Sequence, residues 1–437
     1  MPATGNRQSA TEDADAGRPS ITHRWMSGCP LPGCRLPVAG RLHCIVLRSV
    51  KRPGPLALLL ILAAAIGMGG AWWWTREPVD VGPWVGAVKV LPIDGRFTEP
   101  FGIAVAADGS IFVSDAGTSD RIHRIDARGR MTTLAGSTRG FADGRGGEAR
   151  FATPSGIAIA PDGSLVVADT GNHAIRRITP DGTVTTLAGN GVPGYVDGAA
   201  ADARFRGPLG IAVDADGRII VADTYNDRIR AIDPDGSVRT IAGGDDAEGV
   251  PATGPRSAGY VDGPPSIARF DTPTGVAVDA QGRILVADMA NGAVRIVAPD
   301  GTVSTLATPD ITLVRPIGVT IPSNGLGPVR SVEDSRTVGE GGLSHDVYIA
   351  DEAGRVIIVD GAGTARTIAG GQPGFADGVG DQARFRRSSS IAVRHDETSA
   401  STPLLVADAG NALVRTVMRV HPDAPPVRHW PWTTIDI

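Results

Sequence analysis

Four aspartate–arginine pairs recur in the sequence at a constant spacing, and their charged side chains are its first candidates for a binding or catalytic role. Each pair lies in a segment of the pattern G-[FY]-x-D-G-x4-A-R-F, in which the arginine follows the aspartate by seven residues. The pairs are Asp143/Arg150, Asp197/Arg204, Asp262/Arg269 and Asp377/Arg384. Because opposite charges attract at this separation, we expect an ion pair inside each segment, with the aspartate capping a short helical turn.

The same segments offer a binding surface as the alternative to internal ion pairs. Arginines at equivalent positions would form a ring that attracts an anionic ligand or partner. The candidate binding residues are Arg150, Arg204, Arg269, Arg384, Tyr195 and Tyr260. The phenylalanine that ends each segment is expected to pack between neighbouring repeat units.

A second recurring set pairs the aspartate of a V-A-D element with an asparagine three residues later. The aspartates are followed by Asn172, Asn226, Asn291 and Asn411 in four of six copies, and the full set of turn residues is Asp115, Asp169, Asn172, Asp223, Asn226, Asp288, Asn291, Asp408 and Asn411. Both side chains readily bond backbone N–H groups and shape turns. A single active site does not need four copies, so we interpret this set as structural.

The V-A-D aspartate also marks the repeat that must position these segments. It occurs at residues 115, 169, 223, 288, 351 and 408, so the chain has six units. Each unit holds short β-rich runs separated by Asp-Gly turns, which is the pattern of a four-stranded antiparallel meander. Six such meanders predict an all-β, six-bladed β-propeller.

Closure of the ring is expected to come from the beginning of the repeat region. The sixth unit has three β-runs and then enters a Pro-rich tail, while Val85–Gly95 matches the missing fourth run. An N-terminal strand at residues 85–92 would therefore complete the last blade. The propeller is predicted to span residues 85–420, with a C-terminal tail at 421–437.

The repeat unit P-x-G-[IV]-A-[VI]-x-x-D-G-x-[IL]-x-V-A-D-T-x-N-x-x-[IV]-R-x-I resembles the NHL repeat from about residue 85 to residue 420. The match is degraded in the fifth unit and in the sixth, where Ser388–Ser390 replaces P-x-G. The resemblance implies a protein- or RNA-binding propeller. Propellers of the same fold include metal-dependent lactonases of the gluconolactonase type and a peptide-amidating lyase.

Few residues in the sequence support these enzyme alternatives. Glu99 is similar in position to the E-G-P lead of the lactonases, which would make it a ligand of Ca²⁺ or Zn²⁺ in a lactone or ester hydrolase. Hard cations need several converging oxygens, and the first β-runs offer no second ligand. The histidines occupy unrelated positions in their units. We therefore expect no cofactor and keep the hydrolase as the alternative function.

The N-terminal region is predicted to anchor the chain in a membrane. Residues 1–54 have the composition of a disordered tail, and residues 55–74 form an uncharged run about as long as a bilayer core is thick. Arginine and lysine precede this run, which places the N-terminus in the cytoplasm, and a linker at 75–84 leads to a periplasmic or extracellular propeller. The cysteines, Cys29, Cys34 and Cys44, match no strong metal pattern.

The net charge and the direction of the strands in each blade indicate what kind of partner the propeller binds and through which face. A net charge of −5 gives no sign of nucleic-acid binding. The segments between units are predicted to crowd one face, and the turns between first and second strands the other, with two enlarged turns at Pro322–His345 and His395–Pro403. We expect a membrane-tethered module that binds or scaffolds a protein or small ligand of the cell envelope through the face made by the inter-unit loops.

Overall fold

The computed structural model describes residues 84–244, 258–322, 346–394 and 403–420. The chain divides into two compact units, Met1–Val79 and Asp80–Ile437. The predicted tails, the membrane segment at 55–74 and nearly all of the two enlarged turns lie outside the described residues. Within the described ranges, no helix is long and apolar enough to cross a membrane.

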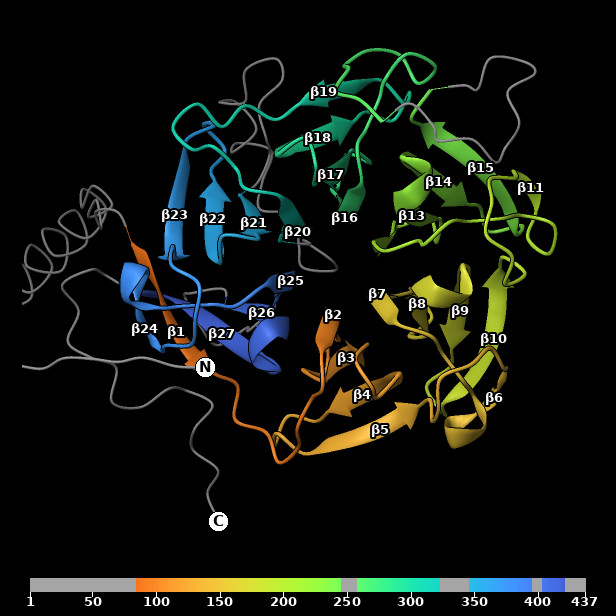
Figure 1. The fold of residues 1–437 in the computed structure, drawn as a ribbon, viewed down its shortest axis with the longest axis horizontal. Helices are drawn as coiled ribbons and strands as arrows, with labels where there is room; N and C mark the ends of the chain where they lie inside the picture. The colour runs from red at the N-terminus through yellow and green to blue at the C-terminus, as the bar shows by residue number, and fades with distance from the viewer. Residues whose placement is uncertain (1–83, 245–257, 323–345, 395–402, 421–437) are drawn as a thin grey trace, which may run out of the picture. The chain divides into compact units, whose positions relative to one another are not determined.

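The described part of the second unit is a propeller of six antiparallel blades around a central channel (Figure 1), as predicted. Blade 1 comprises β2 (Pro100–Val105), β3 (Ile111–Asp115), β4 (Arg121–Ile125) and β5 (Met131–Ala135). Blade 2 comprises β7 (Pro154–Ile159), β8 (Leu165–Asp169), β9 (Ala174–Ile178) and β10 (Thr183–Ala188). Blade 3 comprises β12 (Ile211–Val213), β13 (Ile219–Asp223), β14 (Arg228–Ile232) and β15 (Ser237–Ala242).

The remaining blades follow the same order from the channel outward. Blade 4 comprises β16 (Pro273–Val278), β17 (Ile284–Asp288), β18 (Ala293–Val297) and β19 (Val303–Thr305). Blade 5 comprises β20 (Pro316–Thr320), β21 (Val347–Asp351), β22 (Arg355–Val359) and β23 (Ala365–Gly370). Blade 6 comprises β25 (Ser388–Val393), β26 (Leu404–Asp408), β27 (Leu413–Val420) and β1 (Val85–Val90).

The strand that closes the ring is β1, which pairs antiparallel with β27 through Ala87 and Met418. Just before it, the ring of Trp84 lies between two guanidinium groups, 4.6 Å from Arg366 and 4.1 Å from Arg419. Cation–π contacts of this kind stabilise the position of the ring. They hold the start of β1 against blades 5 and 6.

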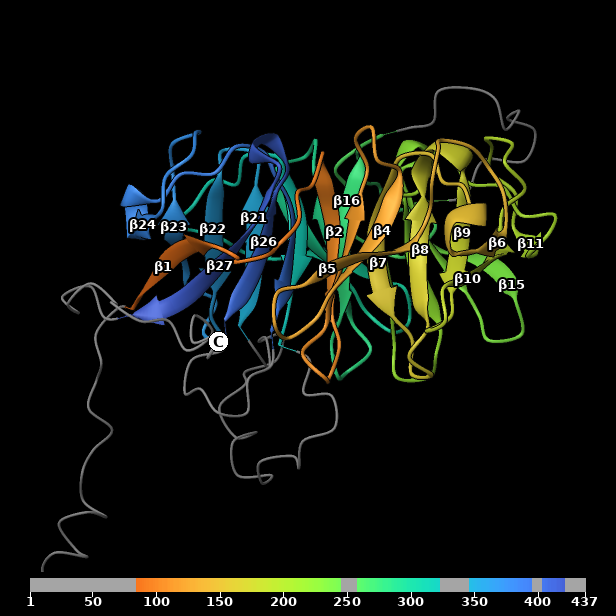
Figure 2. The same cartoon turned by 90° about the horizontal axis from the view of Figure 1, so that it is seen from below.

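The sequence prediction placed the loops between blades on one face of the ring. In the structure these loops do not stay on that face. Their middle residues descend along the rim and add a short strand outside the next blade (Figure 2). These strands are β6 (Gly144–Arg145) on β10, β11 (Gly198–Ala199) on β15 and β24 (Gly378–Val379) on β1. The 3-10 helices η1 (Gly146–Glu148) and η5 (Gly380–Gln382) follow two of them, while η2 (Thr170–Asn172), η3 (Thr224–Asn226) and η6 (Ala409–Asn411) form turns between second and third strands.

The hydrophobic core consists of six clusters, each between two adjacent blades. Four of them contain the phenylalanine that ends an inter-blade loop, which confirms the predicted packing: Phe151, Phe205, Phe270 and Phe385 are fully buried. Close packing at the channel relies on glycine. A Cβ on Gly275 would lie 2.6 Å from the carbonyl oxygen of Ile317 in the next blade, so a side chain here would push the inner strands apart.

Candidate functional site

The aspartates of the inter-blade loops do not pair with the arginines of their own loops, so that prediction is wrong. Asp143 instead accepts a hydrogen bond of 2.6 Å from Arg176, in the third strand of the following blade. The other amino group of Arg176 bonds to Asp169 of the V-A-D element, also at 2.6 Å. A fully buried guanidinium therefore joins two carboxylates that are remote in the sequence.

Aromatic rings and carbonyl groups complete the surroundings of this arginine. The Arg176 guanidinium lies 5.0 Å from the centre of the Phe141 ring and 5.1 Å from that of Phe151. It also donates to the carbonyl oxygens of Ala142 and Arg150. A buried charge is tolerated only when it is paired and hydrogen-bonded, so these contacts fix the loop against blade 2. We call this set of contacts around the Arg176 guanidinium the latch.

The same arrangement occurs in every blade that follows a complete loop. The equivalent arginines are Arg230, Arg295 and Arg415, bonded respectively to Asp197 and Asp223, to Asp262 and Asp288, and to Asp377 and Asp408. Blades 1 and 5 lack the loop, and their third strands carry His123 and Ile357 at this position. The buried arginine and the loop aspartate therefore occur together.

The turn asparagines lie against the same carboxylates. Asn172 donates to the Asp169 carboxylate and to the carbonyl oxygen of Gly140, and Asn226, Asn291 and Asn411 make the equivalent bonds in their blades. Burial raises the pKa of Asp169 to about 6, against the opposing effect of its hydrogen bonds and Arg176. Burial likewise raises the pKa of the other three aspartates, Asp223, Asp288 and Asp408.

Asp115 of blade 1 has a different environment. Burial acts to raise its pKa, but the nearby His123 side chain and hydrogen bonds from the backbone N–H groups of Glu99 and Thr98 outweigh burial and lower it. The Nε2 atom of His123 lies 3.6 Å from the carboxylate. Asp115 thereby holds the segment that enters the first strand of its blade.

Three of the candidate binding arginines have free guanidinium groups. Arg150, Arg204 and Arg384 are exposed, and their side chains make no hydrogen bond or ion pair within the described residues. The stem of Arg150 passes over Gly140, where a Cβ would lie 3.0 Å from Cδ. Arg269 differs, because it is half-buried and donates to the carbonyl oxygens of Ser266, Ile267 and Ala268.

The candidate tyrosines lie over the buried arginines. Tyr260 is 56% exposed and its ring centre is 4.9 Å from Arg295. Tyr195 is half-buried between Arg228 and Arg230, with its hydroxyl 2.7 Å from that of Thr240. Since these arginines and tyrosines repeat on separate blades around the ring, they do not converge on one small ligand.

Exposed apolar side chains gather in the same part of the molecule. All nine large hydrophobic residues that are exposed in the described part of the chain lie in inter-blade loops or in a turn between second and third strands. They are Phe141, Val192, Val196, Tyr225, Tyr260, Val261, Ile267, Val314 and Phe375. We call the surface formed by these loops and turns the loop face.

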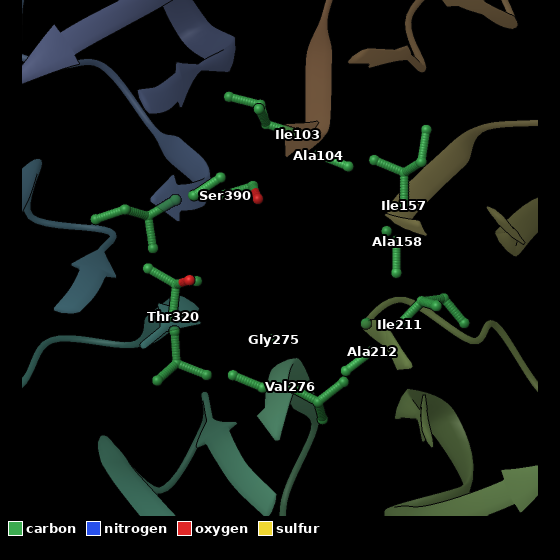
Figure 3. A pocket seen from close by; sticks show the side chains of 18 of the residues that line it. Ile103, Ala104, Ile157, Ala158, Ile211, Ala212, Gly275, Val276, Thr320 and Ser390 are labelled. Carbon is green, nitrogen blue, oxygen red and sulfur yellow. The ribbon is translucent and has the colours of Figure 1, made fainter. Parts of the chain in front are cut away.

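The channel beneath the loop face is apolar (Figure 3). Its volume is about 260 Å³, and its walls are the first strands of the six blades. Aliphatic residues and glycines dominate the lining, with hydroxyl groups from Thr274, Thr320, Ser389 and Ser390, and none of the described residues contributes an ionisable side chain to it. The channel walls therefore provide neither a general base nor a nucleophile with a partner.

Glu99 lies at the channel mouth, but its surroundings do not fit a metal site. Its carboxylate pairs with Arg387, which enters blade 6 at the equivalent position. Within the described ranges, no group of three or more histidine, cysteine, aspartate or glutamate residues is placed to hold a metal ion. A divalent cation would need further oxygen ligands that these residues do not supply.

Comparison with known proteins agrees with this architecture. The NHL repeat model matches residues 151–178, 205–232 and 270–297, which are the first three strands of blades 2, 3 and 4. The chain therefore contains NHL repeats within a six-bladed β-propeller. Solved structures similar to it include an auxiliary nutrient binding protein from Bacteroides ovatus (TM-score 0.51, 14% identity, covering 79% of this chain and 75% of that one). A gluconolactonase from Xanthomonas campestris is also similar (TM-score 0.47, 16% identity, covering 79% and 99%).

Curated proteins match shorter stretches. Protein SUPPRESSOR OF QUENCHING 1, chloroplastic, of Arabidopsis thaliana is 34% identical over 154 residues, which are 32% of this chain and 14% of that protein. NHL repeat-containing protein 2 of Bos taurus is 31% identical over 163 residues, 34% and 21% of the two chains. Teneurin-3 of Danio rerio is 30% identical over 242 residues, 48% and 9%. The chain thus spans at most 21% of the length of these three relatives.

Proposed function

We propose that this propeller is a binding module that holds a protein partner on its loop face. The observation that carries the proposal is the concentration of all nine exposed large hydrophobic residues of the described ranges in the loops and turns of this surface. Arg150, Arg204 and Arg384, which have no ion pair within the described ranges, lie in the same loops. Exposed aromatic and arginine side chains are the types that contribute most to protein interfaces.

The repeated placement of these residues favours an extended partner. Equivalent groups on blades 2, 3, 4 and 6 can contact a surface or a long segment at several points, whereas a small ligand would touch one of them. The guanidinium groups suit a partner that presents carboxylates beside apolar side chains. The NHL repeats at residues 151–178, 205–232 and 270–297 support a role in binding, which the resemblance to that repeat implies.

We further propose that the module works in the cell envelope, tethered by residues 55–74. The support is the uncharged composition of that segment and the basic residues before it. The alternative of a lactone hydrolase has no comparable support, because Glu99 is engaged by Arg387.

The test is a capture experiment with a charge-reversed loop face. The full chain carrying Arg150→Glu, Arg204→Glu and Arg384→Glu together should lose a partner that the unaltered chain retains after chemical cross-linking in cells. The control reverses Arg128, an exposed residue of the turn between β4 and β5 on the opposite face that has no ion pair among the described residues, and this variant should keep the partner. Retention by the first variant, or loss from both, would refute the assignment of the loop face.

A further inference from the structure

Blade 3 departs from the other blades where its first strand begins at the channel mouth. The residue before the three-residue P-x-G lead, or Ser388–Ser390 in blade 6, carries a side chain in every other blade, namely Glu99, Thr153, Thr272, Arg315 and Arg387, whereas blade 3 has Gly207. The adjacent turn shows the reverse exchange, because Tyr225 replaces the glycine or alanine found in the others, Gly117, Gly171, Ala290, Ala353 and Gly410.

Backbone conformation does not explain this glycine. Gly207 has φ +58°, but Thr153 and Thr272 adopt φ 52° and 57° at the same position with their side chains in place. What a side chain at 207 would meet is the ring of Tyr225, whose Cε2 would lie 2.6 Å from the added Cβ. The glycine therefore makes room for the side chain of Tyr225, a residue that is 57% exposed.

Hydrogen-bond donors lie on one side of this ring. The N–H of Tyr225 bonds to the carbonyl oxygen of Arg206 at 3.1 Å, and the exposed Arg206 guanidinium has no partner among the described residues. His173 accepts the N–H of Gly207 at its Nδ1 atom, 3.0 Å away. In the neutral imidazole the proton is then on Nε2, which has no partner in the described part of the chain and can donate.

Carboxylates lie on the other side, towards blade 4, and they are occupied. Asp227 accepts the N–H of Thr272 at 2.8 Å, and Asp271 accepts the hydroxyl of the same threonine at 2.9 Å. These negative charges disfavour a ligand with several anionic groups. A ligand with a single anionic group can still bind on the side of Arg206 and His173, away from these carboxylates.

We propose that Tyr225, Arg206 and His173 form a site at the channel mouth for a small organic acid that contains a ring. The ring of the ligand stacks on the open face of Tyr225, and its carboxylate accepts from the Arg206 guanidinium and from Nε2–H of His173. Either an aromatic acid or a sugar acid has this chemistry. Tyr225 also belongs to the loop face, but binding of the acid does not depend on the partner proposed above.

Binding of benzoate and of glucuronate to the full chain, measured by isothermal titration calorimetry, tests the proposal, with acetate as a carboxylate without a ring. We expect at least one of the two ring acids to bind at least tenfold more tightly than acetate. Binding of benzoate alone would identify an aromatic acid as the ligand class, and binding of glucuronate alone a sugar acid.

Substitutions at the mouth locate the binding. Tyr225→Ala removes the ring, and Gly207→Thr displaces it while leaving every polar group of the site, so each should weaken binding of the acid at least tenfold. Arg206→Gln should do the same, whereas Arg128→Gln, in the exposed turn between β4 and β5, should bind as the unaltered chain does. The proposal is overturned if neither ring acid binds more tightly than acetate, or if Tyr225→Ala and Gly207→Thr bind unchanged.

Discussion

The pairing of Asp143 with Arg176 can be tested by two double-mutant cycles that share one aspartate. Arg176→Met would leave Asp169, whose side chain is fully buried, without its cation. Removing one member of a buried ion pair costs about 3–5 kcal/mol of unfolding free energy. Arg150→Ala removes an exposed side chain without a polar partner, so its cost is expected to be about 0.5 kcal/mol or less.

Asp143→Asn is the substitution that the two double-mutant cycles share. The side chain of Asp143 is 49% exposed, so the loss of its charge-assisted bond to Arg176 is discounted for solvent to about 1 kcal/mol. The coupling energy of Asp143 with Arg176 should therefore be about 1 kcal/mol, and its coupling with Arg150 close to zero. The unfolding free energies are measured by urea denaturation of the full chain. Coupling of Asp143 to Arg150, with none to Arg176, would refute the latch.

Three further substitutions test the buried Asp169, the packing of the inner strands and the closure of the propeller by β1. Burial raises the pKa of Asp169 to about 6, above the value of about 3.9 in an unfolded chain, so its contribution to stability is present below pH 4 and is lost as the pH rises through 6. Relative to Asp169→Asn, the unaltered chain should lose about 2 kcal/mol of unfolding free energy between pH 4 and pH 7, and a relative gain over that range would contradict this. Gly210→Ala should lower the unfolding free energy by about 3 kcal/mol or more, because the new Cβ would overlap the carbonyl oxygen of Thr274, while Gly147→Ala meets nothing within 4 Å and should leave the thermal midpoint unchanged. Trp84→Ala should cost about 2 kcal/mol and speed hydrogen exchange in β1, and unchanged exchange there would mean that the two flanking arginines do not hold the strand.

The sequence predicted the blades well because each one is a local pattern. Four short β-runs recur in five units and three in the sixth, and neighbouring strands in the sequence pair in space, apart from the closing strand β1. Burial of Phe151 and its equivalents followed from the same repetition. The two-residue strands on the rim, such as Gly144–Arg145, are too short to leave a β-pattern.

The ion pairs were not predicted correctly, because the true partner is distant in the sequence. Asp143 and Arg176 are 33 residues apart, whereas Arg150 is only seven residues away. A signal was nevertheless present. Arginine occupies the centre of the third β-run only in units that follow a complete loop, and His123 and Ile357 replace it in the other two. The exchange of Gly207 and Tyr225 is visible when the repeat units are compared, but only the fold shows that the two residues are in contact.

The most direct test of the loop face is site-specific photo-cross-linking in cells. A benzophenone amino acid would replace Tyr260 or Phe375, which are 56% and 59% exposed, and would keep an aromatic ring over the buried arginine. The matched control places the same group at Ala127, an exposed residue of the turn between β4 and β5 on the opposite face. We predict that a discrete protein adduct forms from positions 260 and 375 and is absent from position 127. An adduct from position 127, with none from the two loop positions, would contradict the proposed binding surface.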